Sequence, residues 1–376
     1  MFTTAWTASP QRPAEGFTPN RSREGFWRQS LRQTVRVTAA GDRLRVRLSH
    51  AYGASPLRIA GATVARTAAG AAVEPGSLRR LAFQGADDVV VPAGGSAVSD
   101  PVPLRMKAGQ SLTVTLHFDA VTGPATFHAQ AFTTGYRGAG DRVEDVTGDG
   151  FDESDESWYF LTAVEVDAGR GDAVALFGDS LTDGFGSTPD ADRRWSDALA
   201  RCTGRPVLNA GIGGNLLLND SAWYGERGVH RLARDVLDHP GVDTLVVLQG
   251  LNDIGFSETG EQPTYHPAPV VEAGELIDGY RSLIRQARAR GVRVIGSTLL
   301  PFGGSDHWGE HAAKVSHEVN EWIRCAGEWD AVVDLRRALA DPADPDRLHP
   351  AYDFGDHLHP NDAGYAVMAE AVAELL

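Results

Sequence analysis

The stretch "AVALFGDSLTDG", residues 173–184, joins a short apolar run to a turn that is rich in glycine and aspartate. A bounded run of five apolar residues is typical of a strand that is buried on both faces of a parallel sheet. The C-terminal half repeats this theme in "PVLNA" (206–210), "TLVVLQG" (244–250), "VRVIGS" (292–297) and "AVVDL" (331–335). The sequence therefore predicts a sheet of five parallel strands in this half.

Helical patterns separate these apolar runs. Residues 268–290 and 312–327 carry apolar side chains at helical spacing, and the chain ends in a third such segment, "AGYAVMAEAVAELL". Asn361 or Asp362 is the expected N-cap of the last helix, because a short polar side chain can accept hydrogen bonds from its first free N–H groups. Strands that alternate with helices predict an α/β domain whose sheet is covered on both faces.

The N-terminal half has a period of two instead. Segments such as "RLRVRLSH" (43–50) and "SLTVTLHF" (111–118) alternate apolar and polar residues, and turn-rich segments separate them. This pattern predicts an antiparallel β-sandwich, with the arginines of residues 43–47 on a solvated face. A chain of 376 residues fits two domains. We expect a jelly-roll-like sandwich over residues 1–168 and the α/β domain over residues 169–376.

Composition narrows the classes of partner. The charged residues sum to 35 − 50 = −15, a field that argues against nucleic acid and anionic membranes as partners. No apolar run reaches 18 residues, so we expect no membrane span, and the N-terminus lacks the basic and apolar regions of a signal peptide. The protein is thus cytoplasmic as given or secreted after removal of a signal, and its oligomeric state is left open.

The two cysteines, Cys202 and Cys325, lie far apart in the sequence and form no C-x-x-C motif. This spacing argues against a disulfide framework or a zinc knuckle. The simplest interpretation is two buried thiols, and a single bridge between them stays open.

Polar residues follow the ends of the predicted strands. Because the carboxyl ends of parallel strands meet at one edge of a sheet, we expect these residues to share a rim. They are Ser180 in "GDSLTDG", Gly213 and Gly214 in "GIGGN", Asn252 in "GLND", and two Asp–His pairs in "DRLHPAYDFGDHLHP" (346–360).

This set supplies the groups that acyl transfer requires. A serine nucleophile needs a base, the base needs an orienting group, and the developing oxyanion needs preorganised donors. Ser180 would attack and a histidine would take its proton, while the aspartate three residues earlier would hold the imidazole. The N–H groups of Ser180 and Gly214 and the Asn252 amide would bind the oxyanion, so neither a metal nor a cofactor is needed.

Four segments, "FGDSLTDG", "NAGIGGN", "GLND" and "GDHLHPNDAGY", resemble blocks I, II, III and V of the SGNH (GDSL) hydrolase superfamily, over roughly residues 172–376. The resemblance implies a flavodoxin-like three-layer α/β/α domain, a triad of Ser180, Asp356 and His359, and an oxyanion hole of Ser180, Gly214 and Asn252. The N-terminal half is similar to the β-sandwich that precedes this domain in many actinobacterial members. Residue 182 is threonine, so the G-x-S-x-G elbow of α/β-hydrolases is not matched.

Two of these segments leave a choice between candidate residues. Either Gly213 or Gly214 could point its N–H into the site, and we choose Gly214 because it takes the family's position before the polar residue. The doubled Asp–His motif offers Asp346–His349, in a proline-rich segment, and Asp356–His359, beside the expected cap of the last helix. We choose the second pair, since the cap would anchor its imidazole. His357 is interpreted as a loop histidine.

Two segments match metal-binding patterns in part. "HWGEH" (307–311) fits a zinc-peptidase motif, but Gly309 and the preceding glycines indicate a loop, so we predict no metal. "DVTGDGFDESDE" (145–156) fits a calcium loop at positions 1, 5, 6 and 12 but carries Thr147 at position 3 and lacks flanking amphipathic helices. We interpret it as an acidic interdomain loop, and calcium binding stays a question for a melting experiment.

Aromatic residues lie in loops after the strand ends and are candidates to line an acyl or sugar pocket, among them Trp223, Tyr224 and Trp308. The sequence has no long apolar lid, which favours short-chain or polar substrates. We therefore predict a serine carboxylic-ester hydrolase that acts on short-chain acyl esters, such as O-acetylated carbohydrates or small molecules. The alternatives are acyl transfer by the same triad, a lipase for longer acyl esters, and a carbohydrate-binding protein with an idle catalytic remnant.

Overall fold

The structure is a computed structural model that describes residues 1–15, 18–169, 171–259 and 262–376. The chain forms two compact units, Met1–Gly171 and Asp172–Leu376. Each unit is described by itself below. That residues 1–168 and 169–376 fold as separate domains stays a prediction.

The first unit is built from two main antiparallel sheets. One has the order β1-β16-β3-β10 with β9 beside β3, and the other has the order β14-β13-β2-β11-β5-β6 with β7 beside β5. Their strands are β1 (Thr3–Thr7), β2 (Gln29–Arg36), β3 (Gly41–Ser49), β5 (Gly61–Ala69), β6 (Ala72–Val73), β7 (Arg79–Arg80), β9 (Ser96–Val98), β10 (Val102–Met106), β11 (Ser111–Phe118), β13 (Gly135–Ala139), β14 (Glu153–Asp155) and β16 (Leu161–Val166). Two further pairs are β4 (Leu57–Ile59) with β8 (Val89–Val91) and β12 (Phe127–His128) with β15 (Trp158–Tyr159).

The alternation in the sequence sets which faces pack together. Leu44, Val46 and Leu48 of β3 are fully buried and share one hydrophobic core with the apolar face of β11. The all-β sandwich is therefore confirmed. The opposite face of β3 is less simple than a solvated stripe, because Arg45 and Arg47 both pair with Glu165, which is fully buried on β16.

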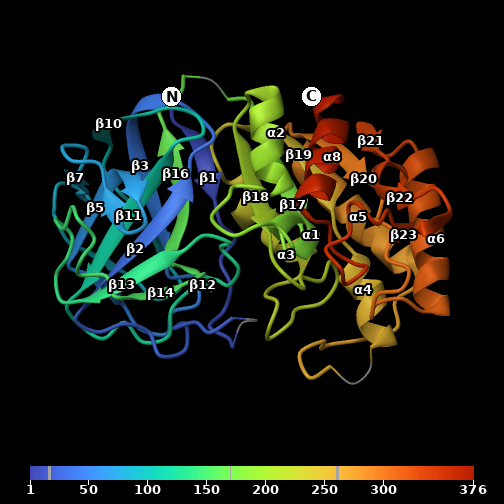
Figure 1. Cartoon of the computed structure of the whole chain (residues 1–376), viewed down its shortest axis with the longest axis horizontal. Coiled ribbons are helices and arrows are strands. Elements are labelled where there is room, and N and C mark those ends of the chain that lie inside the picture. Colours follow the sequence, from blue (N-terminus) through green and yellow to red (C-terminus); the bar gives the residue numbers. More distant parts are fainter. Residues whose placement is uncertain (16–17, 170, 260–261) are drawn as a thin grey trace. The chain divides into compact units, whose positions relative to one another are not determined.

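The second unit contains the predicted sheet of five strands, all of them parallel, in the order β18-β17-β19-β20-β21 (Figure 1). The five apolar runs of the sequence form it, so this fold prediction is confirmed. The strands are β17 (Ala173–Gly178), β18 (Val207–Gly211), β19 (Val242–Leu248), β20 (Arg293–Ser297) and β21 (Ala331–Val333).

Helices of this unit fall into two packed groups, as expected for a sheet that right-handed crossovers cover on both faces. Helix α8 packs against α2 and α7, whereas α5 packs against α3 and α6, and α6 also packs against α4. The helices are α1 (Ser180–Asp183), α2 (Trp195–Thr203), α3 (Gly228–Leu232), α4 (Leu251–Gly255), α5 (Ala273–Arg288), α6 (Glu310–Cys325), α7 (Leu335–Leu339) and α8 (Asp362–Ala373). Short helices η1 (Ala233–Leu237) and η2 (Phe256–Glu258) and a hairpin of β22 (Ala340–Asp341) and β23 (Asp344–Leu348) complete the unit.

The two cysteines differ from their expected environment. Cys202 and Cys325 are both exposed and unbridged, so their interpretation as buried thiols is wrong. Both lie toward the ends of amphipathic helices, on the solvent side.

Within the described residues, no helix has the length and apolar character needed to cross a membrane.

Candidate active site

Three of the candidate residues follow neighbouring strands of the parallel sheet. Strand β17 lies between β18 and β19, and Ser180 begins helix α1 directly after β17. Gly214 follows β18, and Asn252 lies in α4 after β19. Because all three strands run in the same direction, their carboxyl ends place these residues along one edge of the sheet.

His359 reaches this edge from the loop before α8. Its Nε2 lies 2.8 Å from Ser180 Oγ, and its Nδ1 lies 2.7 Å from Asp356 Oδ2. The His359 ring is buried, whereas Asp356 is partly exposed. The Ser180 hydroxyl can donate to a neutral imidazole whose Nδ1–H donates to the carboxylate. This arrangement has the order nucleophile, base and orienting carboxylate that acyl transfer uses.

The loop that carries His359 is anchored at both ends. Asn361 is the N-cap of α8, where its Oδ1 accepts from the N–H groups of Ala363 and Gly364. Its Nδ2 also donates to the carbonyls of Ala351 and Asp353, which closes the loop on itself. The rigid cap therefore sits two residues after the imidazole.

Hydrogen bonds keep the Asp356 carboxylate ionised. Burial pushes its pKa upward, but the hydrogen bond and charge of the His359 ring, together with the N–H groups of His359 and Leu358, outweigh burial and lower the pKa to about 2. A carboxylate that stays charged can hold the imidazole in one tautomer over the working pH range.

The other copy of the motif is used differently. Asp346 lies on β23 and pairs with Arg336 and with His317, not with His349. His349 Nδ1 faces the N–H of Ala351 at 3.1 Å. This proline-rich segment thus forms part of the hairpin of β22 and β23, and Asp346 has the buried Arg336 as its partner.

His357 forms a pair of its own. Its Nδ1 lies 2.6 Å from Asp353 Oδ2, its side chain is about half exposed, and its backbone has φ of 63°. It therefore lies in the same loop as His359 without a hydrogen bond to Asp356, as expected for a loop histidine.

The backbone N–H groups of Gly213 and Gly214, after β18, differ in their hydrogen bonding. Gly213 donates its N–H to Asp183 Oδ2 at 3.0 Å. No hydrogen bond within the described residues uses the N–H of Gly214 or that of Ser180. Gly214 has φ of 70°, and a Cβ there would lie 2.5 Å from the Tyr224 ring. Residue 214 therefore needs glycine both for its backbone conformation and for the space beside Tyr224.

Asn252 is held at both ends of its side-chain amide. Its Nδ2 donates to Asn215 O at 3.1 Å, and its Oδ1 lies 3.1 Å from His307 Nε2. Gln249 Nε2 donates to the same Asn215 carbonyl at 3.0 Å. One Nδ2 hydrogen of Asn252 is thus used, and no hydrogen bond within the described residues uses the second.

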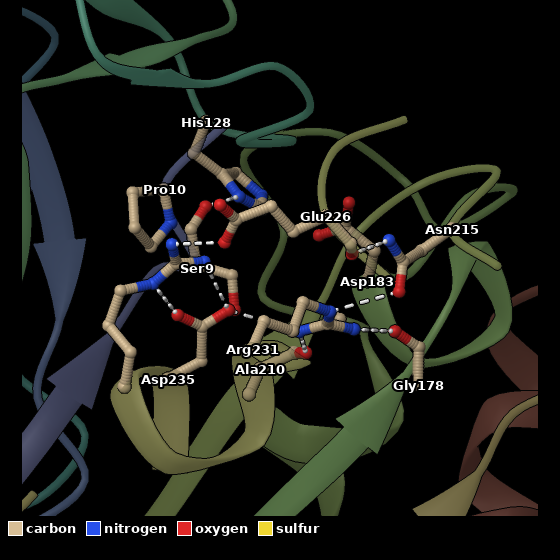
Figure 2. Close-up of polar contacts among 12 residues, drawn as sticks. Ser9, Pro10, His128, Gly178, Asp183, Ala210, Asn215, Glu226, Arg231 and Asp235 are labelled. Atoms are coloured by element: carbon tan, nitrogen blue, oxygen red, sulfur yellow. Dashed lines mark hydrogen bonds and ion pairs between the residues drawn. The ribbon is translucent and has the colours of Figure 1, made fainter. Parts of the chain in front are cut away.

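Figure 2 shows Arg231, which ties the strand ends to the loop after β18. Its fully buried guanidinium donates to Gly178 O at 2.7 Å, to Ala210 O at 2.8 Å and to Asn215 Oδ1 at 2.9 Å, and it pairs with Asp235 at 3.2 Å. These bonds join the ends of β17 and β18 to Asn215, whose carbonyl holds Asn252. The sequence signal for this arginine is weak, since it consists only of Arg231 and Asp235 at the spacing of neighbours on one helix face.

A buried carboxylate, Asp253, also holds the loop after β18. Asp253 accepts from the N–H groups of Leu217 at 2.7 Å and Leu218 at 3.0 Å. Burial is the largest influence on Asp253 and raises its pKa to about 7 despite these hydrogen bonds. Burial likewise raises the pKa of Asp179, the N-cap of α1, to about 7. Neither carboxylate contacts Ser180 Oγ, so we assign both to the support of the loops.

The aromatic candidates lie in different environments. Tyr224 is buried, packs against Phe256 and donates from its hydroxyl to Thr264 Oγ1 at 2.6 Å. Trp223 is partly exposed beside the same cluster, and Trp308 is partly exposed against Phe302.

Two aromatic residues that we did not single out from the sequence lie beside His359. The Phe185 ring lies 4.5 Å from the His359 ring and 5.7 Å from the ring of Phe354, which is 52% exposed. Their sequence signal, single phenylalanines between glycines and aspartates, is too weak to separate them from packing residues.

The side chains of the two segments that match metal-binding patterns in part, 307–311 and 145–156, form other contacts. His307 contacts Asp306 and Asn252, and His311 Nε2 faces the carbonyl of Val271 at 3.0 Å. In the acidic segment 145–156, Asp145 Oδ1 accepts from Thr147 Oγ1 and from the N–H of Gly148. The described residues contain no cluster of three or more side chains arranged to hold a metal ion.

Comparison with known proteins adds the family. A model of the GDSL-like lipase/acylhydrolase family matches residues 176–367, which is more than half of the chain. The chain belongs to this family. It is therefore a carboxylic ester hydrolase by family, with an all-β region before the catalytic fold. A search of curated proteins gives no match.

Solved structures that are similar to this chain each cover about half of it. An inhibitor-bound M. smegmatis aryl esterase is 17% identical with a TM-score of 0.42 and covers 54% of this chain and 97% of its own. An acetyl xylan esterase is 22% identical with a TM-score of 0.41 and covers 54% and 99%. A GDSL-like lipase from Bacteroides thetaiotaomicron is 18% identical with a TM-score of 0.41 and covers 55% and 87%.

Proposed function

We propose that the protein is a serine carboxylic-ester hydrolase that works through an acyl-enzyme on short-chain acyl esters, such as O-acetylated carbohydrates or small molecules. The observation that carries this proposal is the hydrogen-bonded series from Ser180 Oγ through His359 to Asp356, with distances of 2.8 and 2.7 Å. In the first half of the reaction, Ser180 Oγ attacks the ester carbonyl while His359 Nε2 takes its proton. Asp356 holds the resulting imidazolium.

The oxyanion of the tetrahedral intermediate needs donors that are free before the substrate arrives. The N–H groups of Ser180 and Gly214 and the second Nδ2 hydrogen of Asn252 meet this requirement, since no hydrogen bond within the described residues uses them. His359 then gives its proton to the departing alcohol. A water molecule attacks the acyl group, with His359 as its base, and releases the acid.

The surface around the site supports a short acyl group. Binding of a long acyl chain needs a continuous apolar surface. Among the described residues, the exposed large hydrophobic side chains are Met1, Trp27, Val90, Val121, Val270 and Phe354. Of these, only Phe354 is linked by ring contacts to the proposed triad, since it packs against Phe185, which packs against His359. Trp223 and Trp308, which are partly exposed, are our candidates for substrate contact, and we assign Tyr224 to the support of Gly214.

A panel of esters tests the proposal. We expect the protein to hydrolyse p-nitrophenyl acetate and acetylated sugars faster than p-nitrophenyl octanoate, and a fluorophosphonate to label it at Ser180 but not to label Ser180→Ala. Absence of both turnover and labelling would refute ester hydrolysis through Ser180. Preference for the octanoate would point to a lipase, and ester products that form with added alcohols in place of free acid would point to acyl transfer.

A further inference from the structure

A further Asp–His pair, Asp306 and His307, lies in the loop between β20 and α6. His307 is 1% exposed, and its Nδ1 lies 2.6 Å from Oδ1 of Asp306. Its Nε2 lies 3.1 Å from Oδ1 of Asn252, 55 residues earlier in the chain. The pair thus contacts the amide that is proposed to bind the oxyanion, from the side opposite to its Nδ2 group.

Both atoms that face the ring nitrogens of His307 are hydrogen-bond acceptors. Asn252 Nδ2 must donate to Asn215 O, because a backbone carbonyl only accepts. The amide is therefore oriented with Oδ1 toward His307, and Oδ1 also only accepts. The Asp306 carboxylate accepts on the other side of the ring. Both nitrogens of His307 thus face atoms that only accept, so both hydrogen bonds form when each nitrogen carries a hydrogen.

His359 faces a different kind of partner. Its Nε2 lies beside Ser180 Oγ, a hydroxyl that can donate, so a neutral ring satisfies both of its partners. Nε2 of His307 faces an amide oxygen, which cannot donate. The group that faces Nε2 thus differs between these two Asp–His pairs, since it can donate at His359 and only accepts at His307.

The surroundings keep the His307 ring in place. The rings of Phe256 and Tyr265 meet it edge to face, with centroids at 5.6 and 5.3 Å. A Cβ at Gly255 of α4 would lie 2.3 Å from the ring, so α4 packs directly against it.

Asp306 supplies the countercharge for this ring. The hydrogen bond from His307 is the largest influence on Asp306 and lowers its pKa, while the nearby Asp356 and His359 act on it in opposite directions. Burial raises the pKa of the Tyr265 hydroxyl, so this neighbour stays neutral. Glu258 of η2, the next carboxylate along this side, accepts from the N–H of Ala312.

We propose that His307, held by Asp306, is a positioning residue that fixes and polarises the Asn252 amide for the oxyanion, an inference that rests on the proposed function. A hydrogen bond from a charged donor is roughly twice as strong as a neutral one, and a donor on the amide oxygen strengthens the N–H groups of the same amide. Loss of one oxyanion donor lowers kcat by about 10²–10³ in other serine hydrolases. Loss of its positioning residue should therefore lower kcat by roughly 10–100-fold with little change in KM.

A double-mutant cycle tests this role. We expect His307→Leu to lower kcat for p-nitrophenyl acetate in the natural protein and to have no further effect in the Asn252→Ala protein, because its effect passes through Asn252. His307→Gln, which can still donate to Oδ1, should restore much of the loss. His311→Leu, from the same sequence motif, should leave kcat unchanged. Equal losses from His307→Leu in both backgrounds, or no loss in either, would overturn the proposal.

A measurement that does not depend on turnover separates this proposal from the proposed function. In protein labelled with ¹⁵N-histidine, His307 should show two protonated ring nitrogens at pH 7.5, a signal assigned by its loss in His307→Gln. A neutral ring at this pH would refute the proposal even in an active enzyme. An imidazolium in a protein without esterase activity or labelling of Ser180 would keep the hydrogen-bond geometry and refute only ester hydrolysis.

Discussion

His359 Nδ1 lies 2.7 Å from Asp356 Oδ2, whereas His349, at the same spacing from Asp346, has no hydrogen bond to that carboxylate. We therefore expect His359→Ala to abolish measurable ester turnover and His349→Ala to keep most of it. Initial rates with p-nitrophenyl acetate measure both. The reverse pattern would show that His349 and not His359 is the base. Circular dichroism of each variant checks that its fold is kept.

Asp356→Asn tests the orienting carboxylate. An asparagine at this position can present its NH₂ group to Nδ1, which would favour the tautomer with the hydrogen on Nε2 and remove the base that Ser180 needs. We expect kcat to fall on the order of 10⁴-fold while the protein stays folded. His357 and Asp353 supply the matched control, since Asp353→Asn alters an Asp–His pair in the same loop that does not contact Ser180. A similar loss in both variants would indicate damage to the loop instead of a role in proton transfer.

The sequence predicted the fold of the C-terminal unit well because a parallel sheet leaves a simple local signal. Each strand is buried on both faces, so an apolar run such as Ala173–Phe177 marks it without any knowledge of its neighbours. The rim position of Ser180, Gly214 and Asn252 then followed from topology alone. The choice of Gly214 over Gly213 now has a physical basis as a proposal, because Asp183 already uses the N–H of Gly213.

Other features depend on pairs that are distant in the sequence, and no local pattern shows them. His307 contacts Asn252 across 55 residues, and the motif "HWGEH" by itself does not show this pairing. Arg231 gains its function from the carbonyls of Gly178 and Ala210 on two strands. Asp346 forms an ion pair with Arg336 of α7 and not with His349. In each case the partner is chosen by packing, which is a property of the folded chain.

Gly214→Ala probes the turn that presents the proposed oxyanion donor. The substitution keeps the N–H but places a Cβ 2.5 Å from the Tyr224 ring at φ of 70°. We expect a large drop in kcat and a loss of stability beyond the roughly 1–2 kcal/mol of left-handed backbone strain. Gly204→Ala is the matched control, because φ is 65° there and a Cβ would meet no atom within 4 Å. Urea denaturation and initial rates measure the two effects, and equal effects of both variants would contradict a special role for Gly214.

The buried Asp179 predicts a pH-dependent stability. Burial and, to a smaller extent, the nearby Asp253 raise its pKa from 3.8 to about 7. A carboxyl with a raised pKa in the folded state contributes its full stability below about pH 4, and this contribution is lost as the pH rises toward 7. Since one pKa unit is worth about 1.36 kcal/mol, the loss reaches about 4 kcal/mol at pH 8.

Asp179→Asn removes this loss, because asparagine cannot ionise and its Oδ1 can still accept from the N–H of Leu181 at 3.0 Å. We expect the variant to match the natural protein in urea denaturation at pH 4 and to exceed its free energy of unfolding at pH 8. Asp253, whose pKa burial also raises to about 7, keeps part of the pH dependence in both proteins. Asp87→Asn, at an exposed aspartate, should change neither curve. If Asp179→Asn and the natural protein lose the same free energy of unfolding between pH 4 and pH 8, the prediction is wrong. That result would show that ionisation of Asp179 costs the folded state little.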